Sequence, residues 1–216
     1  KPNKSKGLEC FCDADWAGSW QHRSLHDPIS AYSRTGFVIM YAGCPIIWKS
    51  TMQQLIPLST TEAEYISLSS ALREVISVVN LLDELNQHNF PVHGATPKVT
   101  CRTFEDNRSC IEIATNHKTR PRTKHLSVRL HHFRSHVVNK TITTEHISTK
   151  QQIADIFTKP LPRQQFMYLR DKLMNWSSPT KLINDASTSR DVHKTAIGTH
   201  KTHKISSSVT ASQICG

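Results

Sequence analysis

Acidic residues that could act together on a metal ion are spread along this chain of 216 residues. The four that stand out each lie at the end of a predicted strand or the start of a predicted helix: Asp13, Glu64, Asp106 and Asp155. In an open α/β sheet, strand ends and helix starts meet at one edge, so folding could gather these side chains. Gathered carboxylates repel one another unless a cation offsets the repulsion. Because every ligand would be an oxygen, the pattern predicts Mg²⁺ or Mn²⁺.

Two of the four positions have a close neighbour of the same type. Asp15 follows Asp13 by two residues, and alternation along a strand places both side chains on one face. Glu62 and Glu64 are separated by about 200° around a helix, so only one of them can face the site.

Three of the acids also have a purely structural interpretation. Glu64 could pair with Thr61 in a capping box, in which the helix N-cap and the third helical residue satisfy each other's backbone. Asp106 could cap a helix N-terminus, and Asp155 could complement the dipole of a first helical turn.

The predicted elements follow the order of a mixed α/β sheet. An amphipathic helix, with apolar residues three and four positions apart, follows the first three strands and runs to about Gln87. Its candidate N-caps are Ser59, Thr60 and Thr61. The later strands are reached through helices, which favours parallel pairing. The predicted strands cover 8–13, 35–41, 45–50, 98–104 and 141–147, with a possible extension at 54–58. The later helices are predicted at 107–116, at 127–138, after Thr149 and at 164–175.

The composition changes along the chain. Residues 1–6 are predicted to be a linker remnant and residues 7–176 one folded domain. Residues 177–216 are rich in Ser, Thr, Lys and His, so they lack the apolar surface that would offset ordering entropy, and we predict a disordered basic tail. The chain begins without Met, as a segment of a longer polyprotein would.

The charge balance suits an anionic partner. The net charge is +10, and a basic surface around an acidic site is what a binder of phosphate backbones with bound metal needs. The most basic segment is HKTRPRTKH at 117–125. Arg120, Arg122 and Lys124 in this loop are predicted to follow a nucleic-acid backbone.

The cysteines indicate a reducing compartment. Six are present, with no C-x-x-C pair and no spacing typical of zinc. Cys10, Cys12 and Cys101 are predicted to be reduced core residues. The sequence shows no signal peptide and no apolar run of 18 residues, so we predict an intracellular protein without a membrane partner.

Six phrases, in this order, resemble the ribonuclease H domain of copia-type retrotransposon Pol polyproteins. They are DADWAG, GCPIIWKS, STTEAEY, the DN pair at 106–107, RTKH and ADIFTKPL, and the resemblance covers about 7–176. It implies a ribonuclease H-like fold: a mixed five-stranded sheet flanked by helices. It also favours Asp13 over Asp15 and Glu64 over Glu62.

The resemblance further implies an endonuclease that cleaves the RNA strand of RNA–DNA hybrids during reverse transcription, with two Mg²⁺ or Mn²⁺ ions. Asp13 and Asp106 would share the ions, Glu64 would hold the leaving-group side and Asp155 the nucleophile side. The expected partners are the hybrid and the reverse transcriptase domain of the same polyprotein. An active element would place the protein in a cytoplasmic virus-like particle.

Several polar residues could read the 2′-hydroxyls of a hybrid. Ser59, Thr60 and Asn107 are the candidates near the acids, and His125 of the RTKH phrase could contact substrate or pack locally. Trp48 is interpreted as a core residue. Two alternatives remain: a catalytically silent relic or nucleic-acid-binding domain of a decayed element, and a related nuclease acting on DNA.

Overall fold

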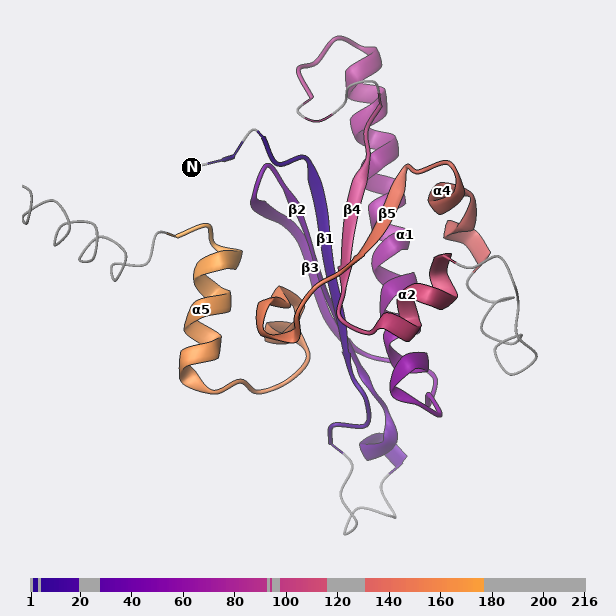
Figure 1. Ribbon diagram of the computed structural model, residues 1–216, viewed down its shortest axis with the longest axis vertical. Helices are drawn as coiled ribbons and strands as arrows, with labels where there is room; N and C mark the ends of the chain where they lie inside the picture. Colours follow the sequence, from indigo (N-terminus) through magenta and orange to yellow (C-terminus); the bar gives the residue numbers. More distant parts are fainter. Residues whose placement is uncertain are drawn as a thin grey trace, which may run out of the picture. The chain divides into compact units, whose positions relative to one another are not determined.

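A mixed five-stranded sheet forms the centre of the domain in the computed structural model (Figure 1). The structure describes residues 2–3, 5–19, 28–92, 94, 98–115 and 131–176. The strand order is β3-β2-β1-β4-β5, in which β1, β2 and β3 pair antiparallel while β4 and β5 run parallel to β1. The strands are β1 (Leu8–Asp15), β2 (Arg34–Tyr41), β3 (Cys44–Met52), β4 (Cys101–Glu105) and β5 (Ile142–His146). This order confirms the predicted ribonuclease H-like fold.

Helices cover both faces of the sheet (Figure 1). The long helix α1 packs on β1 and β2 on one face, with α2 beside it, while η6 packs on β1 and β2 on the other face and contacts α5. The α-helices are α1 (Thr60–Gln87), α2 (Arg108–Thr115), α4 (Arg134–Val138) and α5 (Arg163–Leu173). The 3₁₀ turns are η2 (Pro28–Ala31), η4 (His131–Phe133), η5 (Thr149–Gln151) and η6 (Ile153–Phe157).

The apolar stripe of α1 forms most of the core. Leu68, Leu72 and Val75 are fully buried against Cys10 and Cys12 of β1. By length and composition alone α1 could cross a membrane, but more than half of its apolar stretch is buried inside the domain, as in a core helix. The cysteines predicted to be reduced core residues are buried and free.

A smaller apolar cluster fills the opposite face of the sheet. Because side chains alternate along a strand, Phe11 points away from α1, where its ring stacks on Phe104 of β4 at 4.7 Å between centroids. Ile153 and Ala154 of η6 complete this cluster. The segment that carries Asp155 is therefore anchored to the strand that carries Asp13.

Four predicted elements differ from the observed ones. In the described part of the helix predicted at 127–138, His131–Phe133 forms a 3₁₀ turn and only Arg134–Val138 is α-helical. Residues 54–58 form no strand, and the fourth strand begins at Cys101 rather than at 98. The predicted helix after Thr149 is a pair of 3₁₀ turns, because Gln152 between them has an extended backbone (φ −70°, ψ 104°). The 117–125 loop and the 177–216 tail lie outside the described residues, and the boundaries of linker, domain and tail remain predictions.

Candidate metal centre

Asp13 lies in the part of β1 that continues past the last residue paired with β4. The ladder between β1 and β4 ends at the pair Phe11–Phe104, so the Asp13 side chain lies beside the chain that leaves β4. It is 2% exposed. Its backbone carbonyl accepts a hydrogen bond from Ser67 of α1 at 2.7 Å, which fixes the end of the strand against the helix.

Glu64 is positioned by the start of α1. Ser59 is the N-cap: its Oγ accepts from the Glu62 backbone N–H at 3.1 Å, and the Glu62 carboxylate accepts from Leu58 N–H at 2.8 Å. The predicted capping box of Thr61 with Glu64 is therefore wrong, because the helix begins two residues earlier. Glu62 is held at the cap, which leaves Glu64 buried and facing the sheet.

Asp106 follows β4 directly. Thr149 Oγ1 donates a hydrogen bond to its Oδ2 at 2.7 Å. The side chain of the next residue, Asn107, accepts from Cys110 N–H at 3.1 Å and so caps α2. The interpretation of Asp106 as a helix cap is wrong, because the cap is the next residue, and the Asp106 carboxylate lies half-buried beside Asp13 and Glu64.

These three carboxylates converge. One oxygen of each of Asp13, Glu64 and Asp106, which we call the three-carboxylate group, lies within 4.8 Å of the other two. The oxygens around an octahedral Mg²⁺ at about 2.1 Å are about 3 to 4 Å apart, so small side-chain movements would produce that geometry. Glu64 Oε2 is also buried and accepts no hydrogen bond from the described residues. A hard divalent ion therefore fits this group.

The electrostatics also favour a cation. Burial, together with the neighbouring Glu105, Asp13 and Asp106, raises the pKa of Glu64 to about 11. Burial raises the pKa of Asp13 too, against the opposing effect of Lys159. Without a cation Glu64 therefore carries a proton at neutral pH, and a bound ion would displace it.

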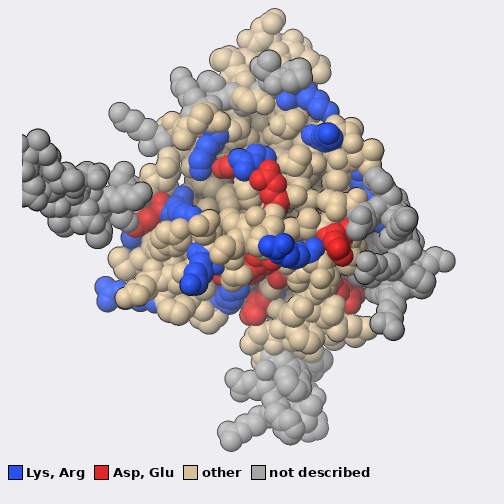
Figure 2. Space-filling view, viewed as in Figure 1, with Lys and Arg blue, Asp and Glu red and all other residues tan. Residues whose placement is uncertain are grey.

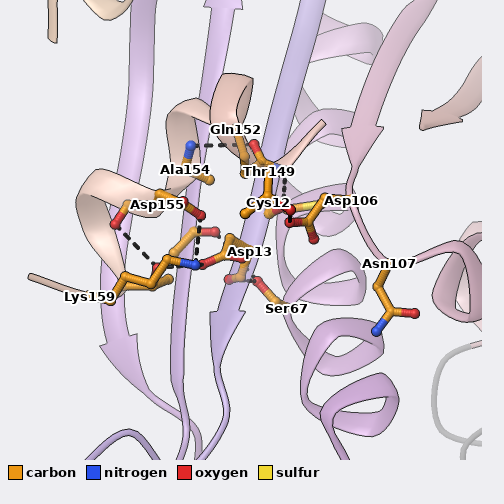
Figure 3. A network of polar contacts seen from close by, with 12 residues as sticks. Cys12, Asp13, Ser67, Asp106, Asn107, Thr149, Gln152, Ala154, Asp155 and Lys159 are labelled. Carbon is orange, nitrogen blue, oxygen red and sulfur yellow. Dashed lines mark hydrogen bonds and ion pairs between the residues drawn. The ribbon is translucent and has the colours of Figure 1, made fainter. Parts of the chain in front are cut away.

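Asp155 lies outside the three-carboxylate group. It is buried in η6, and burial together with Asp13 raises its pKa to about 6. The Lys159 ammonium lies 3.0 Å from Asp155 Oδ1 and 3.7 Å from Asp13 Oδ2, so it bridges the two acids (Figure 3). The hydroxyl of Thr158 donates to the same Asp13 oxygen.

Buried polar groups hold η6 in place. Gln152 Nε2 donates to the Cys12 carbonyl at 2.8 Å, and Gln152 Oε1 accepts from Ala154 N–H at 3.4 Å (Figure 3). These bonds explain the extended backbone at Gln152. Gly36 of β2, opposite Asp13, lets η6 approach, because a Cβ built there would lie 2.5 Å from Thr158 Cγ2.

A deeper acid lies beneath the site. Glu105 is fully buried and accepts hydrogen bonds from the Cys12 thiol at 3.4 Å and from Asn107 N–H at 3.1 Å. Burial raises its pKa to about 8 despite the bond from Asn107 N–H. The sequence analysis did not select Glu105, although it directly precedes Asp106.

Comparison with known proteins places the chain among retrotransposon polyproteins. It is 35% identical over 159 residues to the Pol polyprotein from transposon TNT 1-94 of Nicotiana tabacum, covering 74% of this chain and 11% of that protein. It is 30% identical over 173 residues to that of transposon RE1 of Arabidopsis thaliana, covering 80% and 11%. The chain belongs to the copia-type retrotransposon Pol family. It spans about a tenth of the length of these relatives.

The comparisons with protein-family models and with solved structures give no match or a weaker one. No protein-family model matches this copia-type chain. LC11-RNase H1, solved in complex with an RNA/DNA hybrid, overlaps with a TM-score of 0.46 at 13% identity, over 70% of this chain and 93% of that one. RNase H1 from Halobacterium salinarum overlaps with a TM-score of 0.43 at 12% identity, over 71% and 95%.

Only some of the residues predicted to contact nucleic acid lie in the part of the chain that the structure describes. Ser59 caps α1 and Thr60 is exposed at its first residue. The Asn107 side chain is directed away from the Asp13 carboxylate, toward the start of α2 (Figure 3). Trp48 is 61% exposed, so its interpretation as a core residue is wrong: β3 is an edge strand. Arg120, Arg122, Lys124 and His125 lie outside the described residues.

The sequence analysis missed two residues that contact the acids. Thr158 and Lys159 belong to the ADIFTKPL phrase that identified Asp155. The spacing of Lys159 four residues after Asp155 is the signal that could have indicated it, since residues at this spacing on a helix are neighbours.

Proposed function

We propose that this domain is a divalent-metal-dependent endonuclease that cleaves the RNA strand of RNA–DNA hybrids during reverse transcription of a copia-type element. The convergence of Asp13, Glu64 and Asp106 to within 4.8 Å carries the proposal. The same convergence in a chain of another family would indicate only a cation site. Membership of the Pol family supports the hybrid as substrate.

The acids would divide the work of hydrolysis. Two Mg²⁺ or Mn²⁺ ions held by these acids would supply an activated water and would neutralise the charge of the leaving 3′ oxygen. Asp13 is placed to serve both sides, because it belongs to the three-carboxylate group and its Oδ2 also lies 3.7 Å from Lys159, which pairs with Asp155. Glu64 is then the residue of the leaving-group side and Asp155 that of the nucleophile side. Burial of Asp13 and Glu64 limits the space in which their carboxylates can move.

The surface around the acids would receive the hybrid. Lys and Arg side chains lie among the acidic groups across the face seen in Figure 2. Such cations attract a phosphate backbone, whereas the 2′-hydroxyls distinguish its RNA strand. We retain Ser59, Thr60 and Asn107 as candidates for the 2′-hydroxyls. The basic residues Arg120, Arg122 and Lys124, with His125, are retained for the backbone.

The partner in this scheme is the reverse transcriptase domain of the same polyprotein, which makes the hybrid. The relatives are Pol polyproteins many times longer than this chain, and this supports such a partner. The setting is intracellular, in a virus-like particle if the element is active.

Cleavage of labelled duplexes tests the proposal. The protein is incubated with Mg²⁺ or Mn²⁺ and with hybrid, duplex DNA or duplex RNA. We expect cleavage of the hybrid alone and a loss of at least ~100-fold in Asp106→Asn, because the neutral amide is a poorer ligand for a divalent ion. Asp15→Asn is the matched control, since it makes the same change at an acid of β1 outside the three-carboxylate group, and it should retain activity.

Other outcomes have distinct meanings. Hybrid binding without cleavage by the wild type would instead support a catalytically silent binding domain. Cleavage of duplex DNA would support a DNA nuclease of the same fold. Equal loss in Asp106→Asn and Asp15→Asn would contradict the placement of the site.

A further inference from the structure

The side of the site that holds Asp155 already contains a cation. Lys159 Nζ lies 3.0 Å from Asp155 Oδ1 and 3.7 Å from Asp13 Oδ2 (Figure 3). Both carboxylates are only 2% exposed, so water screens their repulsion poorly. The ammonium is therefore the group that makes their proximity tolerable in the described part of the chain.

Two observations make this cation replaceable. The Lys159 side chain is 33% exposed, so it has a path to solvent. Its ammonium is held by two ion pairs, whereas the hydroxyl of Thr158 also donates to Asp13 Oδ2 and keeps that oxygen oriented without Lys159. A divalent ion carries twice the charge and would compete for the same two carboxylates.

We propose that Lys159 is a built-in counter-ion that occupies the second cation position, between Asp13 and Asp155, and must leave it before a second divalent ion binds. This rests on the proposed function. Lys159 thereby sets an order: the first ion binds at the three-carboxylate group, where Glu64 and Asp106 form no ion pair with the described residues, and the second binds only in exchange for the ammonium. Lys159 is a positioning residue in this role.

Mn²⁺ binding to the full chain tests the proposal without relying on activity. Free Mn²⁺ is measured by electron paramagnetic resonance during titration of the wild type, Lys159→Met and Lys159→Arg. Met keeps the length of the side chain and removes its charge. We expect one stronger and one weaker ion in the wild type, and a second dissociation constant roughly tenfold lower or more in Lys159→Met. Lys159→Arg should keep the weak second site.

Lys172→Met is the matched control for net charge. Its ammonium lies over the Tyr168 ring at 4.8 Å and forms no ion pair in the described residues. This variant should bind both ions as the wild type does. An equal gain in Lys172→Met and Lys159→Met would overturn the proposal, because the gain would then reflect overall charge.

Thermal unfolding gives a second measurement if Lys159→Met is less stable. In EDTA its melting temperature should fall, because two buried carboxylates lose their counter-ion, and Mn²⁺ should raise it by more than it raises that of the wild type. A second affinity that is unchanged or weaker in Lys159→Met would overturn the proposal while leaving the nuclease function intact. Absence of any Mn²⁺ binding by the wild type would overturn both.

Discussion

Metal binding at the three-carboxylate group should depend steeply on pH. The pKa of Glu64 is raised to about 11 by burial and by Glu105, Asp13 and Asp106, so its carboxyl is protonated at neutral pH. A cation must displace that proton in order to bind there. One proton released per ion raises the apparent association constant about tenfold per pH unit. From pH 6.5 to 8.5 the gain is about 100-fold, or about 2.7 kcal/mol.

Calorimetric titration with Mg²⁺ or Mn²⁺ across this pH range measures the slope. Repeating it at pH 7 in buffers of different ionisation enthalpy gives the number of protons released, which we expect to be about one per ion. Glu64→Gln removes the titrating group, so its binding should be weaker and less dependent on pH. The reasoning is refuted if wild-type affinity is constant over the range, or if Glu64→Gln keeps the same slope.

Three further predictions concern stability. Without metal, the pKa of Glu105 is near 4.5 in the unfolded chain and about 8 in the folded one, so the folded state holds a proton that the unfolded state has lost. The stability of the fold should therefore fall as pH rises between these two values. Melting temperatures in EDTA at pH 5 and pH 8 measure this, and equal values would contradict it. Gly36→Ala should destabilise the domain by about 1–3 kcal/mol in urea unfolding, because the new methyl group would overlap with Thr158. Unchanged stability would show that η6 can move away from β2 without a loss of stability. Gln152→Leu leaves the buried Cys12 carbonyl unpaired and should cost about 1–3 kcal/mol in the same assay; a smaller loss would mean that another donor replaces the amide.

Periodic features of the fold could be predicted from the sequence. The stripe containing Leu68, Leu72 and Val75 predicts α1 because burial repeats with the helical period. The alternation of Cys10 and Phe11 predicts β1 for the same reason with a period of two. The three acids at the ends of these elements lie together because the strand order brings β1 beside β4.

Features set by single tertiary contacts could not be predicted. Ser59, Thr60 and Thr61 are equally suitable caps by type, and the choice of Ser59 depends on how the loop before α1 packs. The 3₁₀ turns around Gln152 depend on the Cys12 carbonyl, 140 residues away. Trp48 is a large aromatic residue of the type usually found in a core, but it lies exposed on an edge strand. Sequence periodicity does not show which strand is at the edge of the sheet.

The contacts between η6 and the first two strands determine when the acids can come together during translation. Asp155, Thr158 and Lys159 leave the ribosome more than a hundred residues after Asp13, and both segments are needed at one point in space. A nascent or prematurely terminated chain that stops before this last turn has an incomplete centre. The complete group of acids with its lysine therefore forms only after Lys159 has been translated.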